Sequence, residues 1–144
     1  ESVSRLMSNI REEKGYTYGI SAGIMFYPDS GLLAISTETD NEYVEPLIQE
    51  VYHEIDRLHQ EPVSAEELTI VRNYMLGEMC RSYESPFSLS DAWIFIATSG
   101  LDDDYFSRSL LAVNEVTPME IQDLAQRYLC KETLKEVIAG KKLS

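Results

Sequence analysis

Residues 9–27 read NIREEKGYTYGISAGIMFY, and this stretch decides the fold because a helical pattern gives way to a strand pattern within it. Apolar residues at helical spacing predict a helix over residues 3–13, which stops at Gly15. Residues 16–27 then alternate between two faces, as a β-strand does. One face of this strand is expected to carry Tyr16, Tyr18, Ile20, Ala22, Ile24 and Phe26.

The chain after this strand predicts a hairpin followed by helices. Residues 28–31 (PDSG) have turn chemistry, and residues 32–37 form a second strand antiparallel to the first. Further helices are expected over residues 41–60, 64–81, 85–98, 102–114 and 117–129, and a last strand over 133–139. We therefore predict one α+β domain over residues 1–144, with an antiparallel-dominated sheet packed on one side by helices. Three strands make a thin sheet, so we expect the domain to be partial and to lack its first strand or strands through truncation.

Three helix starts carry capping signals. Thr117, Pro118 and Glu120 combine an N-cap, a proline at the first helical position and a boxed glutamate. Ser64 and Glu67 have the spacing of a capping box, and Thr39 and Glu42 have the same spacing before residues 41–60.

Composition excludes several classes of protein. The 144 residues include 12 Lys and Arg against 25 Asp and Glu, for a net charge of −13, and 44% are hydrophobic. That hydrophobic share is enough for a core and too high for a disordered chain. No apolar run is long enough to span a membrane, and the acidic balance argues against nucleic acid as a partner.

Cysteine and histidine give no metal-binding pattern. Cys80 and Cys130 are expected to be buried thiols, with a single bridge as the alternative. His53 and His59 are six residues apart, about 120° around a helix, so they cannot share an ion, and both are expected at the surface. The acidic run Asp102–Asp104 is explained by a helix N-terminus, where negative charge is favoured.

The helix–strand corner holds the candidate site residues. Arg11 lies in the last turn of a helix, where a cation is favoured, and Tyr18 follows the corner on the strand. Gly19 and Gly23 leave one strand face bare, so another backbone can approach closely. Taken by themselves, these residues are also explained by structural roles alone: the arginine would end the helix, the tyrosines would be half-buried and the glycines would serve packing.

The run REEKGYTY, from Arg11 to Tyr18, resembles the arginine–tyrosine motif in the C-terminal half of the pitrilysin/insulinase family of zinc peptidases, which includes the mitochondrial processing peptidases. In that motif a tyrosine follows the arginine by seven residues, with a glycine between them, as here. Other parts of the chain agree with the family: Leu6 and Ile10, Ser36–Thr39, Pro62–Leu68, Thr117–Ile121 and Val137–Gly140.

The resemblance implies a function and a missing partner. Family members close two homologous halves around a peptide or unfolded chain, and the N-terminal half holds zinc through His-x-x-Glu-His. This chain has no such motif, so the resemblance implies no metal ligand here and zinc in a companion half or homologous subunit. Tyr18 would stabilise the oxyanion as a catalytic residue. Arg11, Tyr18 and Gly19 would contact the substrate.

Two other readings are compatible with the sequence. The chain is alternatively a non-catalytic structural subunit of the same fold, or an acidic binding module unrelated to proteolysis. An unpaired sheet edge would also allow a homo-oligomer to form. The substrate, the cleavage preference and the compartment are not specified by the sequence, although the cytoplasm is the compartment we favour.

Overall fold

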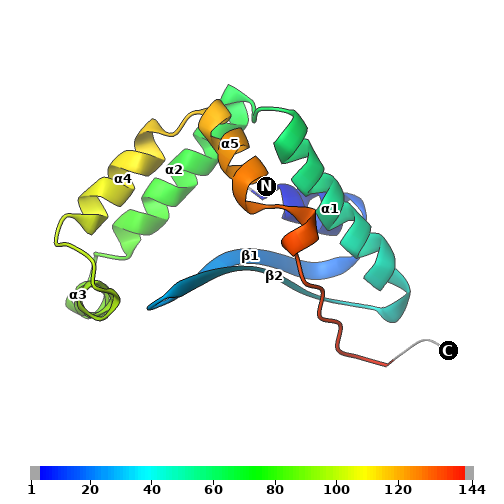
Figure 1. The fold of residues 1–144 in the computed structure, drawn as a ribbon, viewed down its shortest axis with the longest axis horizontal. Helices are drawn as coiled ribbons and strands as arrows, with labels where there is room; N and C mark the ends of the chain where they lie inside the picture. Colours follow the sequence, from blue (N-terminus) through cyan, green and yellow to red (C-terminus); the bar gives the residue numbers. More distant parts are fainter. Residues whose placement is uncertain (1–3, 142–144) are drawn as a thin grey trace.

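The computed structural model describes residues 4–141 and shows an arch of helices above a two-stranded sheet (Figure 1). The sheet is built from β1 (Thr17–Tyr27) and β2 (Ser30–Thr39), and the short helix η1 (Met7–Glu13) precedes it. The longer helices are α1 (Val44–Gln60), α2 (Ala65–Arg81), α3 (Pro86–Ser99), α4 (Tyr105–Glu115) and α5 (Pro118–Tyr128), and short 3₁₀ turns lie at η2 (Asn41–Tyr43) and η3 (Lys131–Thr133). The α+β class and the placement of helices on one side of the sheet are confirmed.

The hairpin forms where it was expected, with a tighter turn. Pro28 and Asp29 alone connect the strands, and Tyr27 already pairs with Ser30. Ile20 and Ile35 lie on the face that meets the core, whereas Ser21 and Ser36 share a hydrogen bond on the outer face. Within residues 4–141 the outer edges of both strands are unpaired, so association through a sheet edge stays a prediction.

The tightest core lies directly beneath the helix–strand corner. Ile10 is fully buried, and it clusters with Ile20 of β1 and Leu47 of α1. Because three elements meet on one isoleucine, the position of η1 depends on both the sheet and α1. The expected start of this helix at residue 3 lies outside the described residues.

Of the three capping signals, one is confirmed in full. Thr117 and Glu120 form a reciprocal capping box at α5, with Pro118 at the helix start. Ser64 accepts the N–H of Glu67, but the carboxylate of Glu67 pairs with Arg5 instead of closing the box. The expected cap at Thr39 is wrong: Asp40 holds the N-cap position of η2 without a side-chain capping bond, and the hydroxyl of Thr39 donates to the carbonyl of Tyr16 at 2.5 Å.

The expected strand over residues 133–139 is wrong, because this segment runs along α1 and pairs with no strand in residues 4–141. Lys131 contacts Asp56 at 2.5 Å, and the hydroxyl of Tyr52 donates to Glu136 at 2.7 Å. These side-chain contacts hold the tail to the helix. An alternating pattern alone does not show whether a partner strand is available.

Two expectations about single side chains also need correction. Cys80 is exposed and Cys130 is half-buried, so the expectation of two buried thiols is wrong; both are free. His53 is exposed as expected, but His59 is half-buried between α1 and α5. Its Nε2 lies 3.0 Å from the carbonyl oxygen of Ala125, so it joins two helices.

Asp102 and Asp104 both pair with Arg108 at the start of α4.

Candidate functional site

Helix η1 carries Arg11 in its last turn and is wider than an ordinary α-helix. The N–H of Lys14 donates to the carbonyl of Asn9, five residues back, at 3.0 Å. Wide turns of this kind are rare in helices and are frequent at functional sites. The side chain of Arg11 is exposed, and within residues 4–141 it makes no hydrogen bond or ion pair, so its guanidinium is free to bind a ligand.

Gly15 turns the chain from the helix into the strand, as expected. Its φ of 68° lies in the left-handed region, which a side chain would make costly. The next residue, Tyr16, then donates its N–H to the carbonyl of Ile10 at 3.0 Å. The corner is therefore fixed by backbone geometry, and Arg11 and Tyr18 are held on either side of it.

A β-bulge directly after the corner sets the direction of Tyr18. Thr17 pairs with Thr39, but the next pair is Ile20 with Thr37, so β1 holds one residue more than β2 in this interval. Thr17 and Ile20 are consequently both buried, and Tyr18 between them is 99% exposed.

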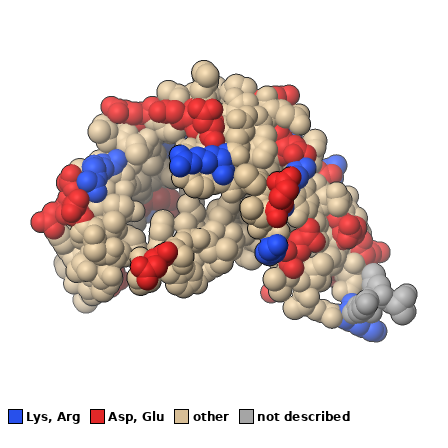
Figure 2. Space-filling view, in the orientation of Figure 1, with Lys and Arg blue, Asp and Glu red and all other residues tan. Residues whose placement is uncertain are grey.

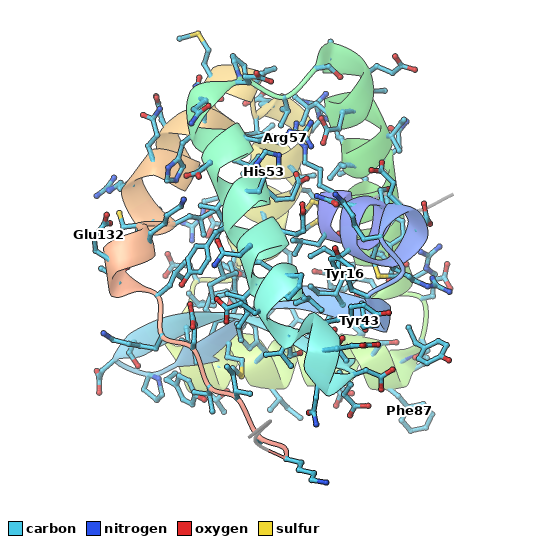
Figure 3. The ribbon with its side chains drawn as sticks, turned by 90° about the vertical axis from the view of Figure 1, so that its right-hand side faces the viewer. Tyr16, Tyr43, His53, Arg57, Phe87 and Glu132 are labelled. Atoms are coloured by element: carbon cyan, nitrogen blue, oxygen red, sulfur yellow. The ribbon has the colours of Figure 1, made fainter. Side chains whose placement is uncertain are left out.

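The bulge corrects the expected alternation of the strand. Tyr18 does not share a face with Tyr16 and Ile20. The ring of Tyr16 instead stacks on Tyr43, with 5.2 Å between centroids, and the two lie side by side (Figure 3).

Two threonine hydroxyls hold the bulge in shape. The hydroxyl oxygen of Thr17 lies 2.6 Å from the carbonyl of Glu38 and 2.9 Å from that of Gly19, and it accepts the N–H of Gly19 at 3.1 Å. Thr37 adds a contact of 2.9 Å to the same carbonyl of Gly19. Both polar backbone groups of Gly19 are thus already used. A Cβ added there would meet nothing within 4 Å, so what Gly19 offers a ligand is open space for close approach.

Polar side chains in and just after η1 attach this helix to α1. The amide nitrogen of Asn9 donates to Glu50 at 3.0 Å and to Glu54 at 2.7 Å, and Lys14 pairs with Glu50 at 3.3 Å. Glu54 is only 3% exposed, and Arg57 of the same helix pairs with it. The hydrogen bond from Asn9, assisted by Lys14, lowers the pKa of Glu50 below its ordinary value.

Sequence reasoning missed this cluster, although a signal was present. Glu54 stands seven residues after Leu47 and three after Val51, which places a carboxylate on the apolar stripe of α1. A carboxylate at such a position must be paired when buried, and Asn9 and Arg57 supply the pairing.

A cleft of about 480 Å³ lies between η1, α1 and α2, and the cluster lines it. His53 and Arg57 project from neighbouring turns of α1 at this cleft (Figure 3). Arg11 and Tyr18 do not line it. They are instead displayed on the open surface of the corner.

Across residues 4–141, no group of three or more His, Cys, Asp or Glu side chains is arranged to hold a metal ion. Acidic side chains are spread widely over the surface in Figure 2. Because such a group is absent from residues 4–141, the side chains of this part of the chain do not fit a zinc site.

In the same range, no helix has the length and apolar character needed to cross a membrane.

Known proteins resemble this chain in sequence and in fold. Residues 1–75 match the model of the family described as the peptidase M16 inactive domain. YmxG of Bacillus subtilis, described as an uncharacterized zinc protease, is 29% identical over 82 residues, which are 57% of this chain and 20% of YmxG. The chain thus spans about a fifth of that relative's length.

Solved structures share the fold at low sequence identity. A peptidase M16 inactive domain from Pseudomonas fluorescens aligns with a TM-score of 0.75 and 21% identity, covering 85% of this chain and 29% of the other. An inactive peptidase domain from Bordetella parapertussis gives 0.72 and 20%, covering 89% and 70%. The periplasmic protease PqqL from Escherichia coli gives 0.65 and 17%, covering 86% and 14%.

The family match covers more than half of the chain, and it includes the corner with Arg11 and Tyr18. The chain belongs to the peptidase M16 family, the zinc peptidases of the pitrilysin type, and corresponds to part of the domain described there as inactive.

Proposed function

We propose that this chain is the substrate-binding, transition-state-assisting part of a zinc endopeptidase that acts on peptides or unfolded chains. The observation that carries the proposal is the bulge, which presents the Tyr18 side chain at 99% exposure on a backbone fixed by Thr17 and Thr37. A solvated tyrosine with no packing role at a built backbone irregularity is better explained by a ligand than by stability, because exposed apolar rings contribute little to a core.

The chemistry of Tyr18 suits an oxyanion. Attack on a peptide carbonyl places negative charge on its oxygen, and a neutral donor stabilises that charge without a competing proton transfer. A tyrosine, with an ordinary pKa of about 10, keeps its proton at neutral pH. One fixed donor of this kind is worth on the order of 10²–10³ in rate.

Arg11 suits the binding of the substrate backbone. Its guanidinium is planar and permanently charged, and it offers five N–H donors and no acceptor. Because no carboxylate in residues 4–141 occupies it, these donors can contact peptide carbonyls without first breaking an ion pair. Gly19 beside Tyr18 leaves room for a peptide backbone to approach the strand.

The zinc belongs to another part of the proposed enzyme. Residues 4–141 offer no metal site, and relatives such as YmxG are several times longer than the matched segment. We infer that a companion half or a homologous subunit supplies the metal and that the peptide lies between the two parts.

The test is Tyr18→Phe in the complete protease, with an unstructured peptide as substrate. The variant keeps the ring and removes only the donor, so kcat should fall by about 10²–10³ while KM changes by less than about threefold. A matched control is Tyr27→Phe, which removes the hydroxyl of a second exposed tyrosine on the same strand. An unchanged kcat in Tyr18→Phe, with intact zinc content, would instead assign the chain to the non-catalytic structural class.

A further inference from the structure

Arg11 is exposed and makes no hydrogen bond or ion pair in residues 4–141, so the position from which its side chain leaves the backbone depends on how η1 is held. The buried Ile10 anchors the helix to the core together with Leu6 and Met7, and the Met7 sulfur accepts the N–H of Ile20 at 3.4 Å.

Arg5, just before the helix, pairs with Glu67 of α2. The polar side-chain contacts nearest to Arg11 come from Asn9, two residues before it, and Lys14, three residues after it.

Asn9 joins two carboxylates that would otherwise repel each other. Glu50 and Glu54 stand four residues apart on α1 and therefore share one helix face. The side-chain amide of asparagine has two N–H donors, and here each carboxylate accepts one of them, at 3.0 Å and 2.7 Å. An apolar side chain of similar size leaves both carboxylates without these donors, and Glu54 is buried.

Lys14 completes the attachment at the other end of the helix. Its ammonium group lies 3.3 Å from Oε1 of Glu50, whose Oε2 accepts from Asn9. One carboxylate thus holds η1 on both sides of Arg11. Arg57 also donates to both oxygens of Glu54 from α1 itself, at 3.0 Å and 3.1 Å, so the buried carboxylate is held by its own helix as well as by Asn9.

We propose that Asn9, with Glu50 and Glu54, is a positioning site that sets the direction of the Arg11 side chain toward the substrate. This inference rests on the proposed function. It assigns a role to residues outside the arginine–tyrosine motif, and it predicts that their effect on the enzyme acts through Arg11.

The experiment is a double-mutant cycle in the complete protease with a peptide substrate. Asn9→Leu should raise KM about tenfold and change kcat less than about twofold, since Arg11 acts in binding. In an Arg11→Ala background, Asn9→Leu should add less than about twofold, because the group that it misplaces is absent. Glu13→Gln, an exposed change on the same helix, is the control and should leave KM unchanged.

The possible outcomes separate the two proposals. If Arg11→Ala raises KM and Asn9→Leu raises KM equally with and without Arg11, Asn9 supports the fold only, and the inference is wrong. If Arg11→Ala itself has no effect, the proposed role of Arg11 in substrate binding fails and the inference fails with it, whereas the role of Tyr18 is decided separately by Tyr18→Phe.

A second variant covers the case in which Asn9→Leu does not fold. Lys14→Met breaks the partly exposed ion pair to Glu50, and it should show the same dependence on Arg11 with a smaller rise in KM, about threefold. Equal effects of Lys14→Met in both backgrounds would overturn the inference.

Discussion

The substitution Thr17→Val tests how the bulge is held, because it removes one hydroxyl and keeps the shape of the side chain. The hydroxyl of Thr17 accepts the N–H of Gly19 and has one proton to share between the carbonyls of Gly19 and Glu38. Thr37 can still donate to Gly19, so the net loss is one accepted and one donated hydrogen bond at a site that is 8% exposed. At about 0.5–1.5 kcal/mol for each bond, the expected cost is about 1–3 kcal/mol.

Hydrogen exchange of the complete protein is the assay, since it reports local opening. The amide of Gly19 should exchange about 5- to 150-fold faster in Thr17→Val than in the unchanged protein. This range is the cost of about 1–3 kcal/mol converted at 1.4 kcal/mol per factor of ten. Ser21→Ala is the matched control, because Ser21 has one exposed hydrogen bond to Ser36 on the outer face. Ser21→Ala should change the free energy of local opening at Gly19 by less than about 0.5 kcal/mol. Equal protection of Gly19 in both variants would refute the role of Thr17.

Three further predictions concern stability and are measured by denaturant unfolding. Ile10→Ala empties a fully buried position and should cost about 2–5 kcal/mol; a loss below 1 kcal/mol would contradict the packing under the corner. Gly100→Ala should cost about 1 kcal/mol, because the C-cap of α3 has a φ of 65°, and an unchanged midpoint would contradict that cap. The side chain and N–H of Thr117 lower the pKa of Glu120 below its ordinary 4.5, so this capping contribution is present above pH 4.5 and is lost as the pH falls through the lowered value. The destabilisation of Glu120→Ala at pH 7 should therefore shrink at pH 3, and a difference that stays constant with pH would contradict it.

Much of the fold could be predicted because local signals and tertiary structure agree. A few neighbouring residues were enough to predict three local features: the turn at Gly15, the turn at Pro28 and Asp29, and the capping box at Thr117. The expected strand at 133–139 failed for the opposite reason. Its alternation is real, but contacts of Lys131 and Glu136 with α1 decide where the segment lies, and those contacts are distant in sequence.

The corner that carries Arg11 and Tyr18 was predicted from the sequence, but the direction of the Tyr18 side chain was not. The motif located Arg11 and Tyr18 at one corner, and strict alternation then put Tyr18 on the same face as Tyr16. A bulge adds one residue and reverses that alternation, and its stabilisation depends on Thr37 from the other strand. The pairing of Asn9 with Glu50 and Glu54 spans more than 40 residues, so no local pattern describes it.

The central claim is that the exposed Tyr18 hydroxyl meets the charge that develops on the substrate carbonyl. A crystal structure of the complete protease with a bound tetrahedral peptide analogue measures this directly. The account predicts that the Tyr18 oxygen lies about 2.7–3.1 Å from the oxygen that mimics the oxyanion, with Arg11 on a neighbouring backbone carbonyl of the analogue. A complex in which Tyr18 still faces solvent, with the analogue bound elsewhere, would contradict it.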